Sequence, residues 1–148
     1  MLSKSLIIFI GVGVLAGFLY GVYLLDVKDP NQLEYVIGPS LSILTEKSDY
    51  KKGEEIKIRL VNSGTVPLTF SDASYGLRIT GLSGILMYSP TTPQVVSTLE
   101  PHQEVEFVWN QIKNNGDAAL EGLYKIHAKG NSDQGNKVEN SITINIWK

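Results

Sequence analysis

The side chains that could carry out chemistry are few and scattered along the chain. His102 and His127 are the only histidines, and there is no cysteine. A transition-metal site needs several ligands at one point, and nucleophilic catalysis needs a base beside a nucleophile. Turn residues surround His102, whereas His127 belongs to the polar face of a predicted strand. We therefore predict no transition-metal site and no catalytic triad.

Paired carboxylates are the next candidates. Glu54 and Glu55 lie where a strand begins, and Glu104 and Glu106 point to one face of another strand. General acid–base catalysis needs pKa values that burial or neighbouring groups push apart. Both pairs lie in polar, exposed patterns, which are typical of solvated strand edges.

Asp117, Glu121 and Asp133 could together supply calcium ligands, but no dense Asp-x-Asp loop is present. The sequence Gly11-Val12-Gly13 lies inside a hydrophobic helix and is not a dinucleotide-binding turn, and no phosphate-binding loop or nucleophile elbow occurs. We predict that the protein is not an enzyme and has no metal or cofactor.

The charge distribution argues against nucleic acid as a partner. The formal net charge is −2, and nucleic-acid binding requires clustered Lys and Arg. Lys125 and Lys129 come closest to a basic stripe, and two lysines on one strand are typical of a solvated face.

The N-terminal segment is strongly hydrophobic. No residue from Ser5 to Leu25 is charged, and at about 1.5 Å per residue a helix over 6–25 covers roughly the 30 Å of a bilayer core. The alternative is a signal peptide cleaved after Ala16. The apolar run continues well past Ala16, however, whereas the apolar region of a signal peptide is usually about 7–15 residues long. We therefore predict a single-pass signal anchor.

Flanking charges predict the orientation of this anchor. Lys4 and the N-terminal amine precede it, whereas Asp26, Lys28 and Asp29 follow it. The positive-inside rule then places residues 1–5 in the cytoplasm and the C-terminal domain on the outer side of the cytoplasmic membrane.

Three glycines recur every four residues within the hydrophobic segment, at Gly13, Gly17 and Gly21. Such a row lets a second helix approach closely in lipid. It predicts a helix-packing face through which the chain forms a homo-oligomer or joins a membrane complex. The alternative is that glycine is simply common in transmembrane helices.

After a linker over 26–40, the hydrophobic period changes to two. Apolar and polar residues alternate over 56–60, 104–109 and 142–146, as in half-buried antiparallel strands. Turn-forming residues separate such runs at short intervals. We predict an all-β, immunoglobulin-like antiparallel β-sandwich of seven to nine strands over 41–148. The predicted strands are 41–46, 55–62, 66–70, 75–80, 84–88, 95–99, 104–110, 122–129 and 138–147.

Gly122-Leu123-Tyr124 opens one of these strands, with Tyr124, Ile126 and Ala128 predicted to point inward. A tyrosine here can bond through its hydroxyl to the preceding corner, which pins Greek-key sandwiches. A plain core tyrosine is the alternative.

An ordered set of motifs resembles the BsuPI-type proteinase-inhibitor domain. The set runs from 50–55 (YKKGEE) through Asn62-Ser63-Gly64 and Pro67 to Trp109-Asn110-Gln111, Gly116 and 122–124. The resemblance covers roughly 41–147 and implies an immunoglobulin-like sandwich that inhibits a proteinase. Two features depart from the family pattern: the turn at 101–104 reads Pro-His-Gln-Glu instead of Pro-Gly-Glu, and the family implies a cytoplasmic protein without an anchor.

The segment 81–93 (GLSGILMYSPTTP) is the most suggestive surface. Ile85, Leu86, Met87 and Tyr88 are apolar without clean alternation, and Pro90 limits sheet pairing. The segment is either an edge strand and loop that contact a protein partner or a central strand covered on both faces. We predict a membrane-anchored, non-catalytic binding or structural module that acts through protein–protein contacts as a small subunit of an envelope or membrane complex. A membrane-tethered proteinase inhibitor is the alternative.

Overall fold

The computed structural model describes the backbone of residues 4–25 and 32–148 and the side chains of residues 10–21 and 32–148. The chain forms two compact units, Met1–Pro30 and Asn31–Lys148. Much of the predicted linker, including Asp26, Lys28 and Asp29, lies outside the described residues, as does Met1 to Ser3.

The first unit contains one helix, α1 (Lys4–Leu25). Its described side chains are apolar and exposed: Leu15 is 64% exposed and Phe18 71%. No helix in the described part of the chain is long and apolar enough to cross a membrane. The membrane-spanning assignment of 6–25 therefore stays a prediction.

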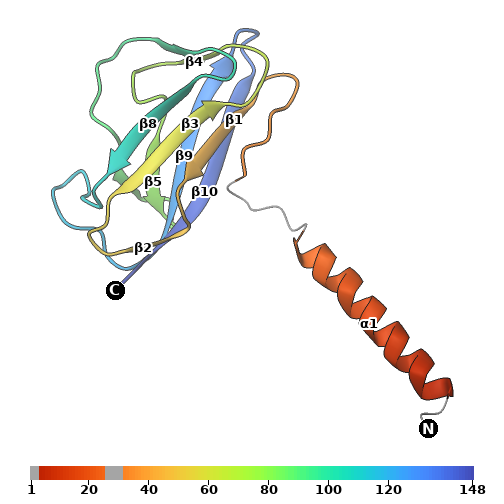
Figure 1. Cartoon of the computed structure of the whole chain (residues 1–148). Helices are drawn as coiled ribbons and strands as arrows, with labels where there is room; N and C mark the ends of the chain where they lie inside the picture. The colour runs from red at the N-terminus through yellow and green to blue at the C-terminus, as the bar shows by residue number, and fades with distance from the viewer. Residues whose placement is uncertain (1–3, 26–31) are drawn as a thin grey trace. The chain divides into compact units, whose positions relative to one another are not determined.

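The described residues of the second unit form ten strands, whose arrangement is shown in Figure 1. They are β1 (Leu41–Thr45), β2 (Asp49–Lys51), β3 (Ile56–Asn62), β4 (Leu68–Phe70), β5 (Arg78–Gly81), β6 (Leu86–Tyr88), β7 (Ser97–Leu99), β8 (Glu104–Trp109), β9 (Gly122–Ser132) and β10 (Lys137–Trp147).

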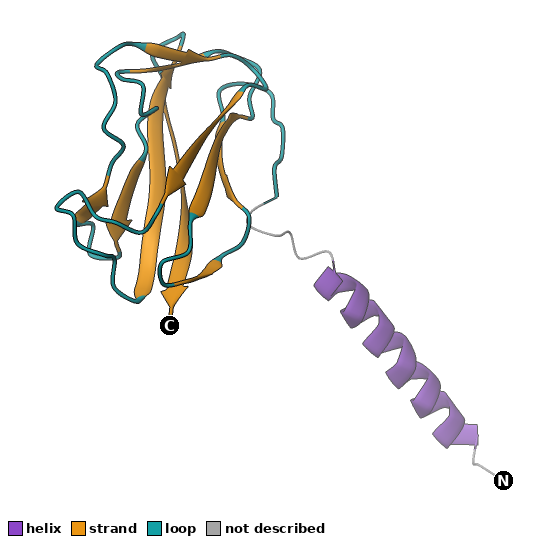
Figure 2. Cartoon of the chain, turned by 60° about the vertical axis from the view of Figure 1, so that its left-hand side comes forward, coloured by secondary structure: helices purple, strands orange, loops and turns teal. Residues whose placement is uncertain are grey.

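These strands form two sheets in a sandwich-like arrangement (Figure 2). The smaller sheet has the order β1-β3-β8. The larger has seven strands: the order β2-β10-β9-β4-β7 forms its main path, and β5 pairs with β9 and with β6. The mostly β, two-layered architecture is thus confirmed.

Two details of the prediction are wrong. Residues 49–51, which lie in none of the predicted strands, form a strand, so the described strands number ten instead of seven to nine. In addition, β2 pairs with β10 in parallel, so the sheet is not wholly antiparallel. The short, polar Asp49–Lys51 segment gives no local strand signal, because its pairing depends on the distant residues Asn145 to Trp147.

Strand β9 also runs further than predicted, to Ser132 instead of residue 129. Gly130 lies in the strand under the ring of Phe70, where an added Cβ would come within 2.5 Å of a ring carbon. Gly130 therefore permits close packing inside the sheet, and the turn falls at 133–136. A glycine within a strand commonly marks such an approach.

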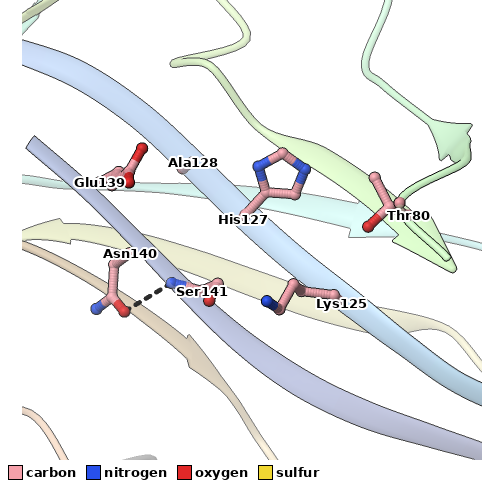
Figure 3. Close-up of a pocket in the computed structure, with 8 residues that line it drawn as sticks. Thr80, Lys125, His127, Ala128, Glu139, Asn140 and Ser141 are labelled. Carbon is pink, nitrogen blue, oxygen red and sulfur yellow. Dashed lines mark hydrogen bonds between the residues drawn. The ribbon is translucent and has the colours of Figure 1, made fainter. Parts of the chain in front are cut away.

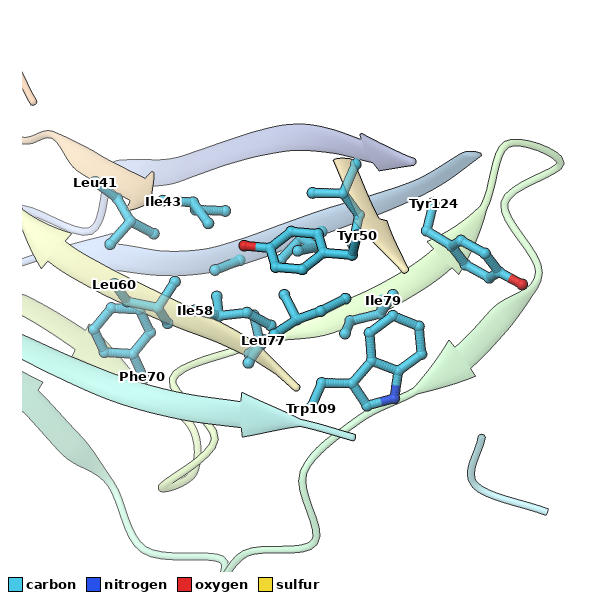
Figure 4. Close-up of a cluster of buried hydrophobic side chains, with 14 of the residues drawn as sticks. Leu41, Ile43, Tyr50, Ile58, Leu60, Phe70, Leu77, Ile79, Trp109 and Tyr124 are labelled. Carbon is cyan, nitrogen blue, oxygen red and sulfur yellow. The ribbon is translucent and has the colours of Figure 1, made fainter. Parts of the chain in front are cut away.

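The hydrophobic core lies between the two sheets (Figure 4). The alternation predicted for β3 is confirmed, since Ile56, Ile58 and Leu60 are fully buried. Trp109 on β8 and Ile126 on β9 are fully buried as well. Side chains at alternate positions of both sheets thus fill the interior, as strand geometry requires.

Candidate functional site

The β5–β6 hairpin carries a cluster of exposed apolar side chains on the larger sheet. A backbone hydrogen bond of 3.0 Å from Gly81 N to Ile85 O closes its turn. Leu82, Ile85 and Leu86 are 65%, 63% and 45% exposed. We call these three side chains the hairpin tip. Burying such apolar area against a partner is favourable.

The other two residues of the predicted contact segment face the core. Met87 and Tyr88 are partly buried against it, and the ring of Tyr88 stacks on Trp109 with 6.0 Å between ring centroids. Among the described strands, β6 pairs with β5 alone, so it lies at a sheet edge. The interpretation as a central strand covered on both faces is therefore wrong.

Asn114 covers the outer edge of β6. Its backbone N–H donates to Met87 O at 2.9 Å, and its side-chain oxygen accepts from Ser89 N at 3.1 Å. Covered edges resist the addition of a further strand. The hairpin tip can thus contact a partner through side chains rather than through strand pairing.

The motifs that resemble the inhibitor family form structural contacts. The Gln111 side chain bonds three backbone groups of the turn between β2 and β3: it accepts from Gly53 N at 2.8 Å and donates to Lys51 O at 2.8 Å and Glu54 O at 2.9 Å. Gln111 is only 2% exposed. It fastens the end of β8 to this turn.

Asn62 makes an equivalent contact at the opposite end of β3. Its amide donates at 2.8 Å to the carbonyl oxygens of Val66 and Leu99, and its side-chain oxygen accepts from Gly64 N. Buried polar groups need such partners. The Asn62-Ser63-Gly64 motif is thus explained by folding.

Tyr124 confirms the predicted corner. Its hydroxyl donates to Leu120 O at 2.7 Å, and its ring packs edge-on against Trp109 at 5.7 Å. Burial raises the pKa of the Tyr124 hydroxyl, and the hydrogen bond to Leu120 opposes this rise. The predicted inward set Tyr124, Ile126 and Ala128 is buried.

The histidines and paired carboxylates lie apart. His102 is in a turn, with its ring 4.6 Å from that of Tyr35, while His127 is on β9. Glu104 forms an ion pair with Arg59 at 2.5 Å. The hydrogen bond from Lys47 lowers the pKa of Glu54, the opposite of what a general acid needs.

Among the described residues, no group of three His, Cys, Asp or Glu side chains could hold a metal ion. The structure does not bring the proposed calcium ligands together: Asp117 instead accepts a hydrogen bond of 2.8 Å from the Asn115 side chain. The glycine row stays a prediction. Among the described residues, nothing outside the local backbone of α1 lies within 4 Å of the Cβ positions of Gly13, Gly17 and Gly21.

An open hollow on the larger sheet was not anticipated from the sequence (Figure 3). Its volume is about 600 Å³, and it lies on the outer face of β9 and β10 beside the β5–β6 turn. The sequence signal was the alternation of Lys125, His127 and Lys129, but without the neighbouring strands it indicated only a solvated face. The lining residues are Thr80, Gly84, Lys125, His127, Ala128, Glu139, Asn140 and Ser141.

No family model matches this sequence. No curated protein matches it either. Among solved structures, the chain is similar to the sporulation control protein Spo0M from Bacillus subtilis, with 13% sequence identity and a TM-score of 0.42. The similarity covers 74% of this chain and 49% of that protein, so the chain spans about half of Spo0M's length. A likeness this distant carries no argument about function.

Proposed function

We propose that the protein is a membrane-anchored, non-catalytic binding module that acts through protein contacts. Its β-sandwich would be of the immunoglobulin type, held on the outer side of the cytoplasmic membrane by α1. It would serve as a small subunit of a membrane or envelope complex.

The exposed hairpin tip is the observation that carries this proposal. Leu82, Ile85 and Leu86 expose apolar surface on a hairpin that the core holds through Met87 and Tyr88. Exposed apolar side chains on a hairpin that is held against the core suit the binding of a protein partner, because little conformational entropy is lost on binding.

Two features support the immunoglobulin type. The first two strands of the domain lie in different sheets. Strand β1 is at the edge of the smaller sheet, and β2 is at the edge of the larger sheet, where it pairs in parallel with the last strand, β10. The Tyr124–Leu120 corner lies at the start of β9. A conserved tyrosine in this position is typical of that fold.

The anchor is supported by the uncharged run from Ser5 to Leu25 and by the exposed apolar side chains of α1. Exposing Leu15 and Phe18 to water is unfavourable, which supports an apolar surrounding for this helix. In the anchored protein, Gly13, Gly17 and Gly21 would face a neighbouring helix.

A matched pair of variants tests the binding surface. Leu86 and Val108 are 45% and 46% exposed strand residues, on the larger and the smaller sheet respectively. We expect Leu86→Asp to abolish co-purification of partners with the full-length chain from native membranes, and Val108→Asp to preserve it. Equal retention by both folded variants would contradict the proposal.

Membrane extraction tests the anchor. The full-length protein should stay with membranes through alkaline carbonate and be released by detergent. Leu15→Arg should shift it toward the soluble fraction, because a central arginine disfavours insertion by about 2.5–3.5 kcal/mol. Release of the unmodified protein by carbonate alone would rule out an integral anchor.

Proteinase inhibition of the BsuPI type is the second candidate. The resemblance motivates it, and the segment between β6 and β7 supports it with exposed, strand-free residues, including Val95 at 59% and Val96 at 71%. Proteinases bind extended segments of this kind. Loss of inhibition of a proteinase panel in a Val96→Asp variant would support this candidate, and no inhibition by the unmodified protein at micromolar concentration would exclude it.

A further inference from the structure

Two basic side chains, Lys125 and His127, line the hollow on the larger sheet, and Arg78 and Lys129 lie next to them on the paired strands β5 and β9. Arg78 on β5 is the register partner of His127 on β9, and Lys125 and Lys129 flank His127 on the same strand face. Among the described residues, Glu139 is the one carboxylate that lines the hollow. Although the whole chain has a net charge of −2, this region is basic. We call Arg78, Lys125, His127 and Lys129 the cationic row.

The lysines and arginine of this row have no carboxylate within salt-bridge distance among the described residues. Glu139 is the register partner of Lys129 across β9 and β10, but its ion pair, at 2.7 Å, is with Lys137. Asp72 lies near enough to Arg78 to feel its charge, but it accepts hydrogen bonds from the backbone and hydroxyl of Ser74. The basic groups are thus available to an external anion.

The pKa of His127 responds both to burial and to the charges of the cationic row. Burial, followed by the charges of Arg78 and Lys125, lowers its pKa; Lys129 acts in the same direction and Glu139 opposes them. An anion bound beside the imidazole would raise this pKa again, because it would stabilise the imidazolium.

We propose that the hollow binds an extended acidic segment of the protein partner, a proposal that rests on the proposed function. Alternate residues on a strand lie about 6.6–6.8 Å apart, as do alternate side chains of an extended peptide. A peptide laid along β9 with acidic residues at every second position therefore places carboxylates beside Lys125, His127 and Lys129 together. The hydroxyls of Thr80 and Ser141 add hydrogen-bond donors.

The hairpin tip adjoins this hollow. Gly84 of the β5–β6 turn lines it, and Leu86 pairs with Thr80, which lines it too. One partner segment can therefore contact both surfaces. Its acidic residues would follow β9, and an apolar residue next to them would contact Leu86.

NMR titration of the full-length chain in zwitterionic detergent tests this inference. The probe is the peptide Glu-Ser-Glu-Ser-Glu with blocked ends, and the imidazole signals of His127 and His102 are followed separately. We expect the peptide to shift the His127 signal and raise its pKa, with His102 unchanged. The Lys125→Gln, Lys129→Gln double variant should weaken binding about tenfold, and added salt should weaken it as well.

The paired variant Lys57→Gln, Lys113→Gln is the control, since both lysines lie outside the hollow and in ion pairs. It should bind the peptide as the unmodified chain does. An unmoved His127 signal at millimolar peptide would overturn the inference, as would an equal shift with inorganic phosphate, which would indicate nonspecific anion attraction. If the peptide fails while Leu86→Asp still abolishes partner capture, the proposed function stands without this inference.

Discussion

Polar side chains in the interior of the sandwich differ from those on the outer face of its larger sheet in whether they have bonding partners. Inside, Gln111 and Asn62 each bond three backbone groups. No buried side-chain nitrogen or oxygen among the described residues lacks a partner. Outside, neither Lys125 nor Lys129 forms an ion pair among the described residues, although Glu139 is the register partner of Lys129.

This difference separates structural from functional candidates. A polar side chain whose hydrogen bonds all end on its own backbone is explained by folding. An unpaired basic row beside an exposed apolar hairpin is not. Asn62, Gln111 and Tyr124, which belong to the motifs that resemble proteinase inhibitors, are in the first group. For these residues the resemblance reflects the fold rather than an activity.

The largest effect should come from the interior. Gln111→Ala would leave Gly53 N and the carbonyls of Lys51 and Glu54 without their side-chain partner, and we expect it to lower the free energy of unfolding by about 3 kcal/mol. Chemical denaturation measures this. Gln103→Ala, which removes one exposed bond to Glu100 N, should cost less than about 0.5 kcal/mol. Equal losses would show that the buried contact has no special role.

A smaller loss should follow removal of the corner bond. Tyr124→Phe deletes the hydroxyl that donates to Leu120 O and keeps the ring against Trp109. We expect a decrease of about 1 kcal/mol in the free energy of unfolding. Tyr35→Phe, at a 52% exposed position, should change it little. An unchanged free energy of unfolding in Tyr124→Phe would show that the hydrogen bond from Tyr124 to Leu120 does not stabilise the fold.

The cationic row should contribute almost nothing to folding. Lys125→Gln and Lys129→Gln should each change the free energy of unfolding by less than about 0.5 kcal/mol. On the smaller sheet, Arg59→Gln breaks the ion pair with Glu104 and should cost up to about 1 kcal/mol. A marked loss of unfolding free energy in either lysine variant would show that the cationic row stabilises the fold, which would contradict the contrast drawn between the interior and this face.

His127 should give a small pH dependence of stability. Because its pKa in the folded protein is lowered, the unfolded chain binds a proton more readily. Its contribution is therefore present above the ordinary value of about 6.5 and is lost as pH falls from there through the lowered pKa. His127→Gln should reduce the pH dependence of the denaturation midpoint over this range, whereas His102→Gln should leave it as in the unmodified protein. Identical profiles would contradict the assigned pKa shift.

The sequence predicted the strands whose signal is local. Alternation located β3, β8 and β10, and turn residues located most of the boundaries. It missed β2 and the end of β9, because the first depends on pairing with β10 and the second on the fit of Gly130 under Phe70.

The candidate site was predictable only in part. The exposed Ile85 and Leu86 were singled out by their apolar run, but the inward direction of Met87 and Tyr88 depends on contacts with Trp109 and the rest of the core. Arg78 could not be grouped with Lys125 and Lys129, since only the pairing of β5 with β9 brings it beside them.

Site-specific photocrosslinking in native membranes tests the central claim most directly. A photoreactive amino acid would replace Leu86 in one full-length variant and Val108 in another, since both positions are equally exposed. The account predicts a discrete crosslinked protein partner from position 86 and none from position 108. The same product from both positions, or none from position 86 in a folded, membrane-bound chain, would contradict the hairpin as the recognition surface.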